Sequence, residues 1–391
     1  MLRFLTAGES HGKGLVTIID NFPSGVKIDR DFIDEKLALR QSGYGRGARQ
    51  KIETDKIEFL SGVRGSYTTG SPISFFIKNK DYENWVERMD IFKPVDEKNK
   101  IHIPRPGHAD FAGSLKYNLD DIRNVLERSS ARETASRVAV GAICQILLKG
   151  FGIEFASGVA GIGEVNACNY IDLFNEDILK NIKNSELRMP YPDLEARAKA
   201  LIDKIKAEGD TIGGLIIAQV NNLPVGLGSF TQWDEKLDAH IAMSLMSIQA
   251  IKSVEIGLGI ESGYVRGSRY QDSIYLNKNN DNYNEKNRRY FRKTDNAGGI
   301  EGGMSNGEII SVRCAMKPIP TLMKPYLDTV DLKTGEAEKA FLERSDVCAV
   351  PAASVVGEAA LAFSVCYFFL KKFGGDSFEE IKRNYEGYIK S

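Results

Sequence analysis

The sequence predicts a mixed fold of the α+β class, organised as one domain with two similar halves. Three observations lead to this prediction. Segments with the apolar spacing of helices are interspersed with short β-rich segments. Three stretches recur at a constant offset of about 200 residues. No proline-rich or serine-rich linker divides the chain into independent units.

The first elements are a strand and a helix. Residues 15–19 are apolar and β-branched, which predicts a strand. Asp29 is a typical N-cap for a helix that extends to about Arg40 with one apolar face. Residues 71–77 are again rich in β formers and predict a second strand.

Longer helical patterns follow. Residues 122–148 carry apolar side chains at helical spacing, most clearly from Thr134 onward. The same spacing predicts helices over 195–207, 234–251 and 351–372. Residues 277–287 are polar and rich in asparagine, which predicts a mobile loop.

The recurring stretches suggest a duplicated strand–helix–strand unit. Residues 15–25, followed by Asp-Glu-Lys-Leu at 34–37, resemble residues 215–226, followed by Asp-Glu-Lys-Leu at 234–237. Residues 72–81 match residues 272–281 at the same offset. The alternative is chance, because short strand–turn–helix patterns often look alike. A real duplication implies halves of about 1–200 and 201–372 within one domain.

Composition excludes several classes of function. The formal net charge of −1 gives no reason to expect nucleic acid or an anionic membrane as a partner. The N-terminus turns polar too soon for a signal peptide, and the apolar stretch 359–370 is too short to span a bilayer. Five scattered cysteines without Cys-x-x-Cys favour free thiols in a cytoplasmic protein. The four dispersed histidines predict no metal site.

Glycine-rich loops do not fit the standard phosphate motifs. The stretch 8–14 is too short for a P-loop and lacks the Ser or Thr after its lysine. The stretches 43–47 and 257–263 do not have the dinucleotide-binding spacing. Ordinary tight turns explain each of these glycine clusters better than a bound ligand does.

Arginines beside glycine, serine and histidine are more informative. Because guanidinium groups bind phosphate and carboxylate in bidentate fashion, four such groups in a nearly neutral chain predict a small polyanionic ligand. The alternative for any one arginine is a solvated surface position. The four groups are Arg40, Arg46 and Arg49 around the loop 43–47, Arg105 before Pro106-Gly107-His108, Arg128 and Arg132, and Arg344 before the last predicted helix.

Two histidines lie in short loops that contain glycine. His11 is between Ser10 and Gly12, and His108 is between Gly107 and Ala109. A side chain that titrates near neutrality, placed where backbone can approach a ligand, suits proton transfer. His102 and His240 are interpreted as structural or surface residues.

Several long motifs, spread from residue 8 to residue 348, resemble the signatures of chorismate synthase. They are Gly8-Glu-Ser-His-Gly, Gly43-Tyr-Gly-Arg-Gly-Ala-Arg49, Ser61-Gly-Val-Arg-Gly, Arg105-Pro-Gly-His-Ala-Asp110, Glu127-Arg-Ser-Ser-Ala-Arg-Glu-Thr134, Met246-Ser-Ile-Gln-Ala, Ala297-Gly-Gly-Ile-Glu-Gly-Gly-Met-Ser-Asn-Gly307, Lys317-Pro-Ile-Pro-Thr321 and Arg344-Ser-Asp-Val-Cys348.

The resemblance implies a β–α–β sandwich formed by residues 1–391 as a single domain, with helices layered between two largely antiparallel sheets and an internal duplication. Residues 373–391 match a variable tail. The implied assembly is a homotetramer. The implied reaction converts 5-enolpyruvylshikimate 3-phosphate to chorismate and phosphate by a 1,4-anti elimination, the last step of the shikimate pathway. It requires reduced FMN without net redox change. A chain of this size resembles the monofunctional type, which relies on an external flavin reductase, with NADPH as an indirect source of reductant.

The resemblance also implies site residues. His11 would protonate the departing phosphate, His108 the reduced flavin, and Asp346 would assist proton removal, although it could instead pair with Arg344. Arg40 and Arg46 match positions to which NADP binding is also attributed. Substrate binding is implied for Arg40, Arg46, Arg49, Arg105, Ser130, Arg132 and Arg344. Cofactor binding is implied for Arg40, Arg46, Arg128, Ser129, Ser130, Gln249, Ala250, Gly302, Lys317, Pro318, Ile319, Pro320, Thr321 and Arg344.

Three positions depart from the family pattern. Gln249 and Ser253 replace other usual residues in a segment expected to contact ligands through its backbone. Asp295 adds a negative charge beside a presumed anion site, so it either points outward or weakens the ligand contacts of that loop. Two other classes of function remain open, an NADPH-dependent flavin oxidoreductase and a non-catalytic protein that binds phosphorylated shikimates.

Overall fold

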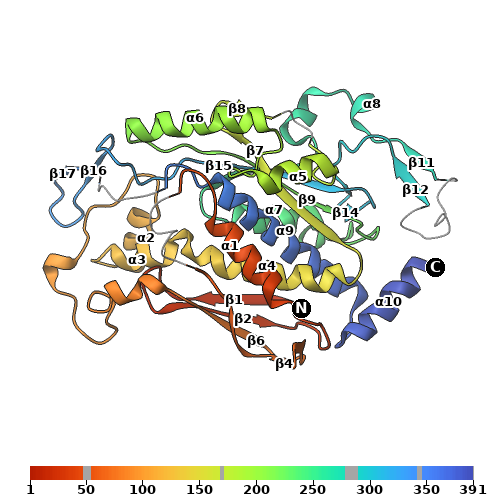
Figure 1. The fold of residues 1–391 in the computed structure, drawn as a ribbon, viewed down its shortest axis with the longest axis horizontal. Helices are drawn as coiled ribbons and strands as arrows, with labels where there is room; N and C mark the ends of the chain where they lie inside the picture. Colours follow the sequence, from red (N-terminus) through yellow and green to blue (C-terminus); the bar gives the residue numbers. More distant parts are fainter. Residues whose placement is uncertain (47–53, 168–170, 278–288, 341–345, 391) are drawn as a thin grey trace.

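A computed structural model of the chain describes residues 1–46, 54–167, 171–277, 289–340 and 346–390. Figure 1 shows two β-sheets with a layer of helices between them, and further helices outside the second sheet. The predicted α+β class is therefore confirmed.

The first sheet is antiparallel and has the strand order β1-β2-β6-β3. Its inner face is fully buried because alternate residues of β2 and β6, such as Leu15, Ile73 and Phe75, point toward the helices. Its strands are β1 (Arg3–Ala7), β2 (Gly14–Asp20), β6 (Ile73–Lys78) and β3 (Glu58–Ser61). A small hairpin, β4 (Val63–Arg64) and β5 (Tyr67–Thr68), lies between β3 and β6 in the sequence.

The helical layer contains the most apolar helix of the chain. Helices α4 and α9 pack closely, since Gly141 of α4 lies against Ala359 of α9. By length and composition α9 could cross a membrane, but 83% of its most apolar window is buried in the core. The layer consists of α1 (Arg30–Gln41), α4 (Thr134–Lys149), α7 (Leu237–Met246) and α9 (Val350–Phe373).

The second sheet is also antiparallel and has the order β10-β15-β9-β7-β8. Ile182 of α5 packs against its outer face. The strands are β10 (Ile251–Ile256), β15 (Ile310–Met316), β9 (Gly214–Asn221), β7 (Glu154–Ile162) and β8 (Val165–Asn166), and the helices beyond them are α5 (Glu176–Asn184) and α6 (Pro192–Glu208).

The remaining elements are short and lie around the two sheets. The helices are η2 (Lys80–Asn84), η3 (Glu97–Asn99), α2 (Asp110–Tyr117), α3 (Arg123–Ser129), η4 (Ala131–Glu133), η5 (Trp233–Glu235), η6 (Gly259–Tyr264), α8 (Gly267–Tyr270) and the C-terminal α10 (Phe378–Lys390). The strands are the hairpins β11 (Ile274–Leu276) with β12 (Tyr290–Arg292), β13 (Ile300–Glu301) with β14 (Met304–Ser305), and β16 (Asp328–Val330) with β17 (Ala337–Lys339).

The two sheets share a strand order, but one predicted match between the halves is wrong. In the first sheet the strands run β1-β2-β6-β3, and the second sheet contains β7-β9-β15-β10. In the second sheet the strand that corresponds to β6 is therefore β15, whereas the described residues 272–277 include the exposed strand β11 of a separate hairpin. The two Asp-Glu-Lys-Leu stretches also differ, since 34–37 lies within α1 and 234–237 spans η5 and the first residue of α7.

Two predicted helices are shorter than expected. The helix over 234–251 ends as α7 at Met246, because the chain turns at Ala250, with a positive φ of 68°, and continues as β10. The helix over 122–148 is broken at Ser130, which has extended backbone with φ −60° and ψ 141°. Within the predicted loop 277–287, residues 278–287 lie outside the described residues.

Candidate active site

His11 lies in the connection between β1 and β2, against the start of the helical layer. Its side chain is buried, and Nδ1 lies 2.8 Å from Oε1 of Glu127. The backbone N–H of His11 donates to the other oxygen of the same carboxylate over 2.7 Å. Trp85 covers the imidazole, with the ring centroids 4.0 Å apart. The predicted acid is therefore held at its backbone, at one ring nitrogen and on one ring face.

Two buried arginines share one carboxylate near this histidine. Arg40 donates through Nη2 to Asp55 over 2.7 Å, and Arg132 Nη1 is 2.7 Å from both Asp55 oxygens. Burial alone would raise the pKa of Asp55, but the two guanidinium groups hold it below its usual value. Burial lowers the pKa of Arg40. Two cations on one anion leave an excess of positive charge, as a bound polyanion requires.

Hydrogen bonds connect this arginine pair to the His11 turn. Arg132 Nε donates to Asn79 Oδ1 over 2.8 Å, and Asn79 Nδ2 donates to the carbonyl oxygens of Ser10 and Gly12. Ser130 Oγ lies 3.1 Å from Ser10 Oγ. His11, Ser130, Arg132 and Arg40, which are far apart in the sequence, therefore belong to one bonded unit.

His108 is held by a second carboxylate. Asp110 Oδ1 is 2.5 Å from His108 Nδ1, and Asp110 Oδ2 accepts from Nε of Arg105 over 2.8 Å. Arg105 Nη2 also lies 3.1 and 3.2 Å from the two ring nitrogens of His108. Burial would raise the pKa of Asp110, but hydrogen bonds from His108 and Arg105 hold it far below its usual range. The carboxylate is thus ionised at neutral pH and accepts from Nδ1–H.

Residues predicted to bind the cofactor surround this second histidine. Lys317 Nζ donates to the carbonyl oxygen of Gly107 over 2.9 Å, and Arg105 Nη1 donates to Thr321 Oγ1 over 3.0 Å. The backbone N–H of Lys317 donates to the carbonyl oxygen of Ala250 over 2.9 Å. The segment 317–321 therefore meets the His108 loop of the first half, and Ala250 is bonded to that segment at Lys317.

A further chain of contacts joins Gln249 to Arg128. Gln249 Nε2 donates to Glu133 Oε2 over 3.3 Å, and Thr6 Oγ1 donates to the other oxygen of Glu133. Arg128 Nη2 donates to the carbonyl oxygen of Thr6 over 2.8 Å. Gln249 Oε1 is buried without a hydrogen-bond partner among the residues that the structure describes. An orphaned buried acceptor of this kind fits a site that is completed by a ligand.

Other predicted residues have contacts of their own. Asp346 pairs with Arg46, over 2.9 Å, whereas Arg344 and Arg49 lie outside the described residues. Gly302 lies in the turn between β13 and β14 with a φ of 58°. Ser129 Oγ donates to the carbonyl of its own helix at Leu126. The segment Pro318, Ile319 and Pro320 is fixed by the bond from Thr211 Oγ1 to the Ile319 carbonyl oxygen.

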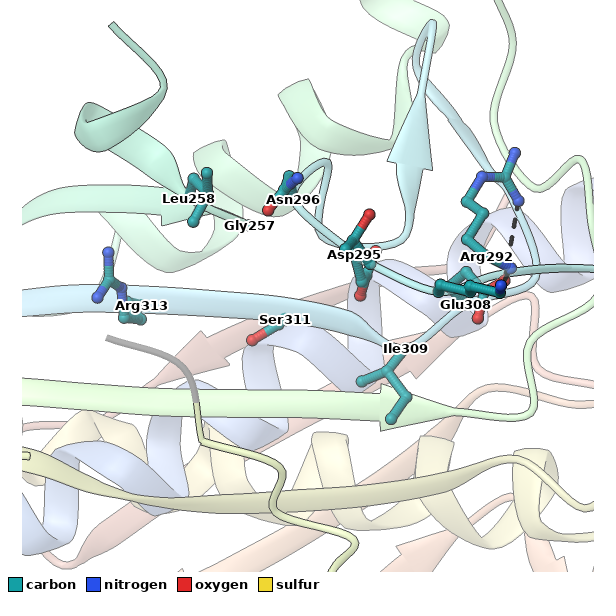
Figure 2. A pocket seen from close by; sticks show the side chains of 11 residues that line it. Gly257, Leu258, Arg292, Asp295, Asn296, Glu308, Ile309, Ser311 and Arg313 are labelled. Carbon is teal, nitrogen blue, oxygen red and sulfur yellow. Dashed lines mark hydrogen bonds and ion pairs between the residues drawn. The ribbon is translucent and has the colours of Figure 1, made fainter. Parts of the chain in front are cut away.

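Two cavities differ in their relation to these groups. One of about 540 Å³ is lined by Arg105, Gly107 and His108 together with Asp328 and Thr329 of the hairpin β16–β17. The other, of about 380 Å³, contains none of the predicted catalytic residues (Figure 2). It contains Asp295, a half-buried residue whose Oδ1 accepts from the N–H of Gly299 over 2.7 Å. Asp295 therefore faces a cavity instead of open solvent.

The two remaining histidines have structural surroundings, as predicted. His102 Nε2 is 3.5 Å from Glu97 on the surface. His240 stacks on Tyr367 with 4.6 Å between ring centroids, and burial lowers its pKa. Within the described residues no group of three or more His, Cys, Asp and Glu side chains is arranged to hold a metal ion.

Comparison with known proteins identifies the family. The family model described as chorismate synthase matches residues 2–370. The chain belongs to the chorismate synthase family. It is accordingly a lyase of the last step of the shikimate pathway. The "Chorismate synthase" of Alkaliphilus metalliredigens is 53% identical over 391 residues, covering 99% of each chain, and that of Geobacter metallireducens is 51% identical, covering 100% of this chain and 98% of the relative. A solved structure, "Crystal Structure of Chorismate Synthase", is 41% identical, with a TM-score of 0.78 over 99% of this chain and 97% of that one.

Sequence reasoning missed the partners that hold the predicted site residues of this chorismate synthase family member. Glu127 and Asp110 occur in the quoted motifs, but a motif alone does not reveal that each of these carboxylates faces a histidine. Asp55 and Asn79 lie outside every motif, and their distance from Arg132 along the chain does not predict a contact with it. Trp85 is one of two tryptophans in the sequence, and nothing in the sequence around it predicts a contact with His11.

Proposed function

We propose that this enzyme converts 5-enolpyruvylshikimate 3-phosphate to chorismate and phosphate by 1,4-anti elimination, with reduced FMN and without net redox change. The observation that carries the proposal is the buried pair Arg40 and Arg132 on the single carboxylate Asp55, bonded to the His11 turn. An excess of buried positive charge beside a proton donor suits a substrate that carries a phosphate and two carboxylates.

His11 is the proposed acid for the departing phosphate. It belongs to the same bonded unit as Arg132 and Ser130, which are proposed substrate-binding residues. Arginine charge neutralises the anion as it leaves, and a proton from the imidazole completes the leaving group. Arg46, Arg49, Arg105 and Arg344 are proposed to bind the remaining anionic groups.

His108 is the proposed acid for the flavin. It is bonded to Arg105, and through it to Thr321, while Lys317 contacts the neighbouring Gly107. Since 317–321 is a proposed cofactor segment, these contacts support the assignment of His108 to the flavin. Asp346 is proposed to assist proton removal, although it pairs with Arg46 in this structure.

The residues present fit FMN. Arg128 and Lys317 supply positive charge, and the unpartnered Gln249 Oε1 is available to accept a hydrogen bond. Ser129, Ser130, Ala250, Gly302, the segment 318–321 and Arg344 complete the proposed cofactor set. Reduced FMN, when bound, supplies a transient electron donation that helps to expel phosphate from a substrate whose C–H bond is not acidified by a neighbouring carbonyl. The protein positions both molecules, neutralises charge and supplies protons.

We further propose that the enzyme is a cytoplasmic homotetramer and monofunctional. An external reductase would then supply reduced flavin, with NADPH as the indirect reductant, even though Arg40 and Arg46 match positions linked to NADP. The chain is proposed to form one domain of two related halves, 1–200 and 201–372. The repeated strand order of the two sheets supports a repeat, but β7 (Glu154–Ile162) of the second sheet lies before residue 201, and the sequence match at 272–281 does not support it.

One anaerobic experiment tests the activity. The enzyme is incubated with the substrate and chemically reduced FMN, and phosphate, chorismate and the flavin spectrum are followed. We expect phosphate and chorismate in equal amounts only with reduced flavin, which stays reduced, and no turnover with NADPH and oxidised FMN alone. Stoichiometric NADPH oxidation would indicate an oxidoreductase, and tight binding without product would indicate a binding protein. Either result would overturn the proposal.

A further inference from the structure

The buried carboxylate of Glu127 binds His11 at two atoms. Glu127 lies near the end of α3 and is 3% exposed. Both of its oxygens accept from His11, Oε2 from the backbone N–H over 2.7 Å and Oε1 from Nδ1 over 2.8 Å, and Oε1 also accepts from Nη1 of Arg123 over 3.3 Å. One side chain therefore fixes the main chain and the imidazole together.

The ionisation state of Glu127 decides which ring nitrogen of His11 carries the proton. Burial alone would raise the pKa of Glu127, but the hydrogen bonds and charge of His11, with a contribution from Arg123, hold it below its usual value. Glu127 is thus an anion at neutral pH and can only accept hydrogen bonds. The proton of neutral His11 must then lie on Nδ1, which leaves Nε2 as the nitrogen that gains and loses the exchangeable proton.

Trp85 restrains the same ring from its face. The indole is tilted by 32° to the imidazole, and its Nε1 donates to Asp81 over 3.1 Å. An aromatic face also stabilises a neighbouring cation. The imidazole is therefore confined at an edge by Glu127 and at a face by Trp85.

We propose that Glu127 is the positioning residue of His11: it fixes the Nδ1–H tautomer, directs Nε2 to the substrate and stabilises the imidazolium that donates the proton. Its catalytic part rests on the proposed role of His11 as an acid. The structural part, the tautomer, does not depend on that role.

The first test is Glu127→Gln, which keeps the shape and removes the charge. We expect kcat to fall by about 10- to 100-fold, a part of the 10²–10⁴-fold that a general acid contributes, with little change in KM. The alkaline limb of the kcat pH profile should move to lower pH, because the imidazolium loses its counter-charge. The matched control is Asp121→Asn, since Asp121 is also buried and accepts from the backbone N–H groups of Ile101 and Arg123 but touches no histidine. Its pH profile should stay unchanged.

A double-mutant cycle separates positioning from a general structural effect. If Glu127 acts through His11, Glu127→Gln should not lower kcat further when His11 has already been replaced by Ala. Full additivity of the two losses, with an unchanged pH profile in Glu127→Gln, would overturn the proposal.

Nitrogen-15 NMR of histidine-labelled enzyme tests the tautomer without any activity measurement. The chain has four histidines, and the His11 signal is assigned by its loss in His11→Ala. We expect the pure Nδ1–H form in the wild type when the imidazole is neutral, and a mixture in Glu127→Gln. A wild-type His11 in the Nε2–H form would refute the inference even if the enzyme makes chorismate. The expected tautomer in an enzyme that makes no chorismate would instead refute the proposed function alone.

Discussion

Each predicted catalytic histidine depends on a carboxylate that the structure keeps ionised. At His108 the carboxylate is Asp110, which is shared with Arg105, whereas at His11 it is Glu127. The two imidazoles therefore differ, because a permanent guanidinium cation touches His108 and an indole face touches His11. This asymmetry agrees with two acids that serve different targets.

Replacing Asp110 by Asn tests the second pair. The substitution removes the negative charge and one of the two acceptor oxygens that hold His108 Nδ1 and Arg105, so kcat should fall by about 10- to 100-fold. Steady-state kinetics with reduced FMN measure the effect. Asp328→Asn, on the rim of the same cavity, serves as the control, since Asp328 pairs with Lys339 and should leave kcat within twofold of the wild-type value. Equal losses in both variants would contradict the special role of Asp110.

At the scale of the elements, the crossing of α4 and α9 depends on a glycine. A Cβ at Gly141 would lie 2.4 Å from Cα and Cβ of Ala359, well inside contact distance. The two backbones can therefore approach so closely only because this position has no side chain.

Gly141→Ala should therefore destabilise the protein by about 1–3 kcal/mol through overpacking. The matched control is Gly387→Ala in α10, where a Cβ would meet no atom within 4 Å. There the better helix propensity of alanine should stabilise by about 0.5–1 kcal/mol. Urea denaturation of both variants measures the difference. An unchanged free energy of unfolding in Gly141→Ala would show that α4 and α9 can move apart without loss of stability.

The stability of the turn between β12 and β13 depends on the protonation of Asp295. Burial, the largest cause, raises the pKa of Asp295 from 3.8 to about 7, and the charges of Glu308 and Asp272 add to the effect. Because the folded state favours the neutral acid, the stability contributed by Asp295 is complete below about pH 4 and is lost as the pH rises to about 7.

Asp295→Asn should remove this pH dependence. We expect the variant to unfold at a higher Tm than the wild type above pH 7, with a difference that shrinks toward pH 4. Calorimetry between pH 4 and pH 8 measures it. Glu301→Gln is the control, since Glu301 forms a half-exposed ion pair with Arg292. A constant difference at every pH would indicate altered packing instead of titration.

At the scale of the whole molecule, one apolar core joins the two halves. Leu15 and Phe75 of the first sheet belong to the same cluster as Ile216 of the second sheet and Phe369 of α9. The predicted catalytic residues follow the same pattern, because the His108 loop contacts Lys317. Neither half retains a complete core or a complete site alone.

Unfolding should therefore be cooperative across both halves. The two tryptophans allow a direct measurement, since Trp85 lies in the first half and Trp233 in the second. Single-tryptophan variants, Trp85→Phe and Trp233→Phe, should give coincident denaturation curves after correction for the stability of each variant, as monitored by fluorescence and circular dichroism. A transition seen by one tryptophan before the other would show independent halves.

Local elements were largely predictable from the sequence. The strand at 15–19, the N-cap Asp29 and the long helix near 351–372 all occur, because apolar spacing and capping are local signals. The break at Ser130 and the end of α7 at Met246 were missed, since an apolar pattern continues through both positions. The false match at 272–281 arose because spacing along the chain does not reveal which strands pair.

The candidate site was predictable only in part. The family motifs contain His11, His108 and most of the arginines, and the structure brings several of them into bonded groups. Asp55 and Asn79 could not be predicted, because their contacts with Arg132 join segments that are far apart in the sequence. A motif identifies residue types, whereas ion pairs between distant segments depend on the tertiary fold.

The buried cysteines can report how often the core opens. All four that the structure describes, Cys144, Cys314, Cys348 and Cys366, are buried, and burial raises the pKa of Cys314 to about 12 and of Cys348 to about 11. The thiolate is the nucleophile that attacks a thiol reagent, so these buried, protonated side chains react only when the surrounding structure opens. The rate at which a thiol reagent modifies these four cysteines therefore measures how often the interior of the protein is exposed to solvent.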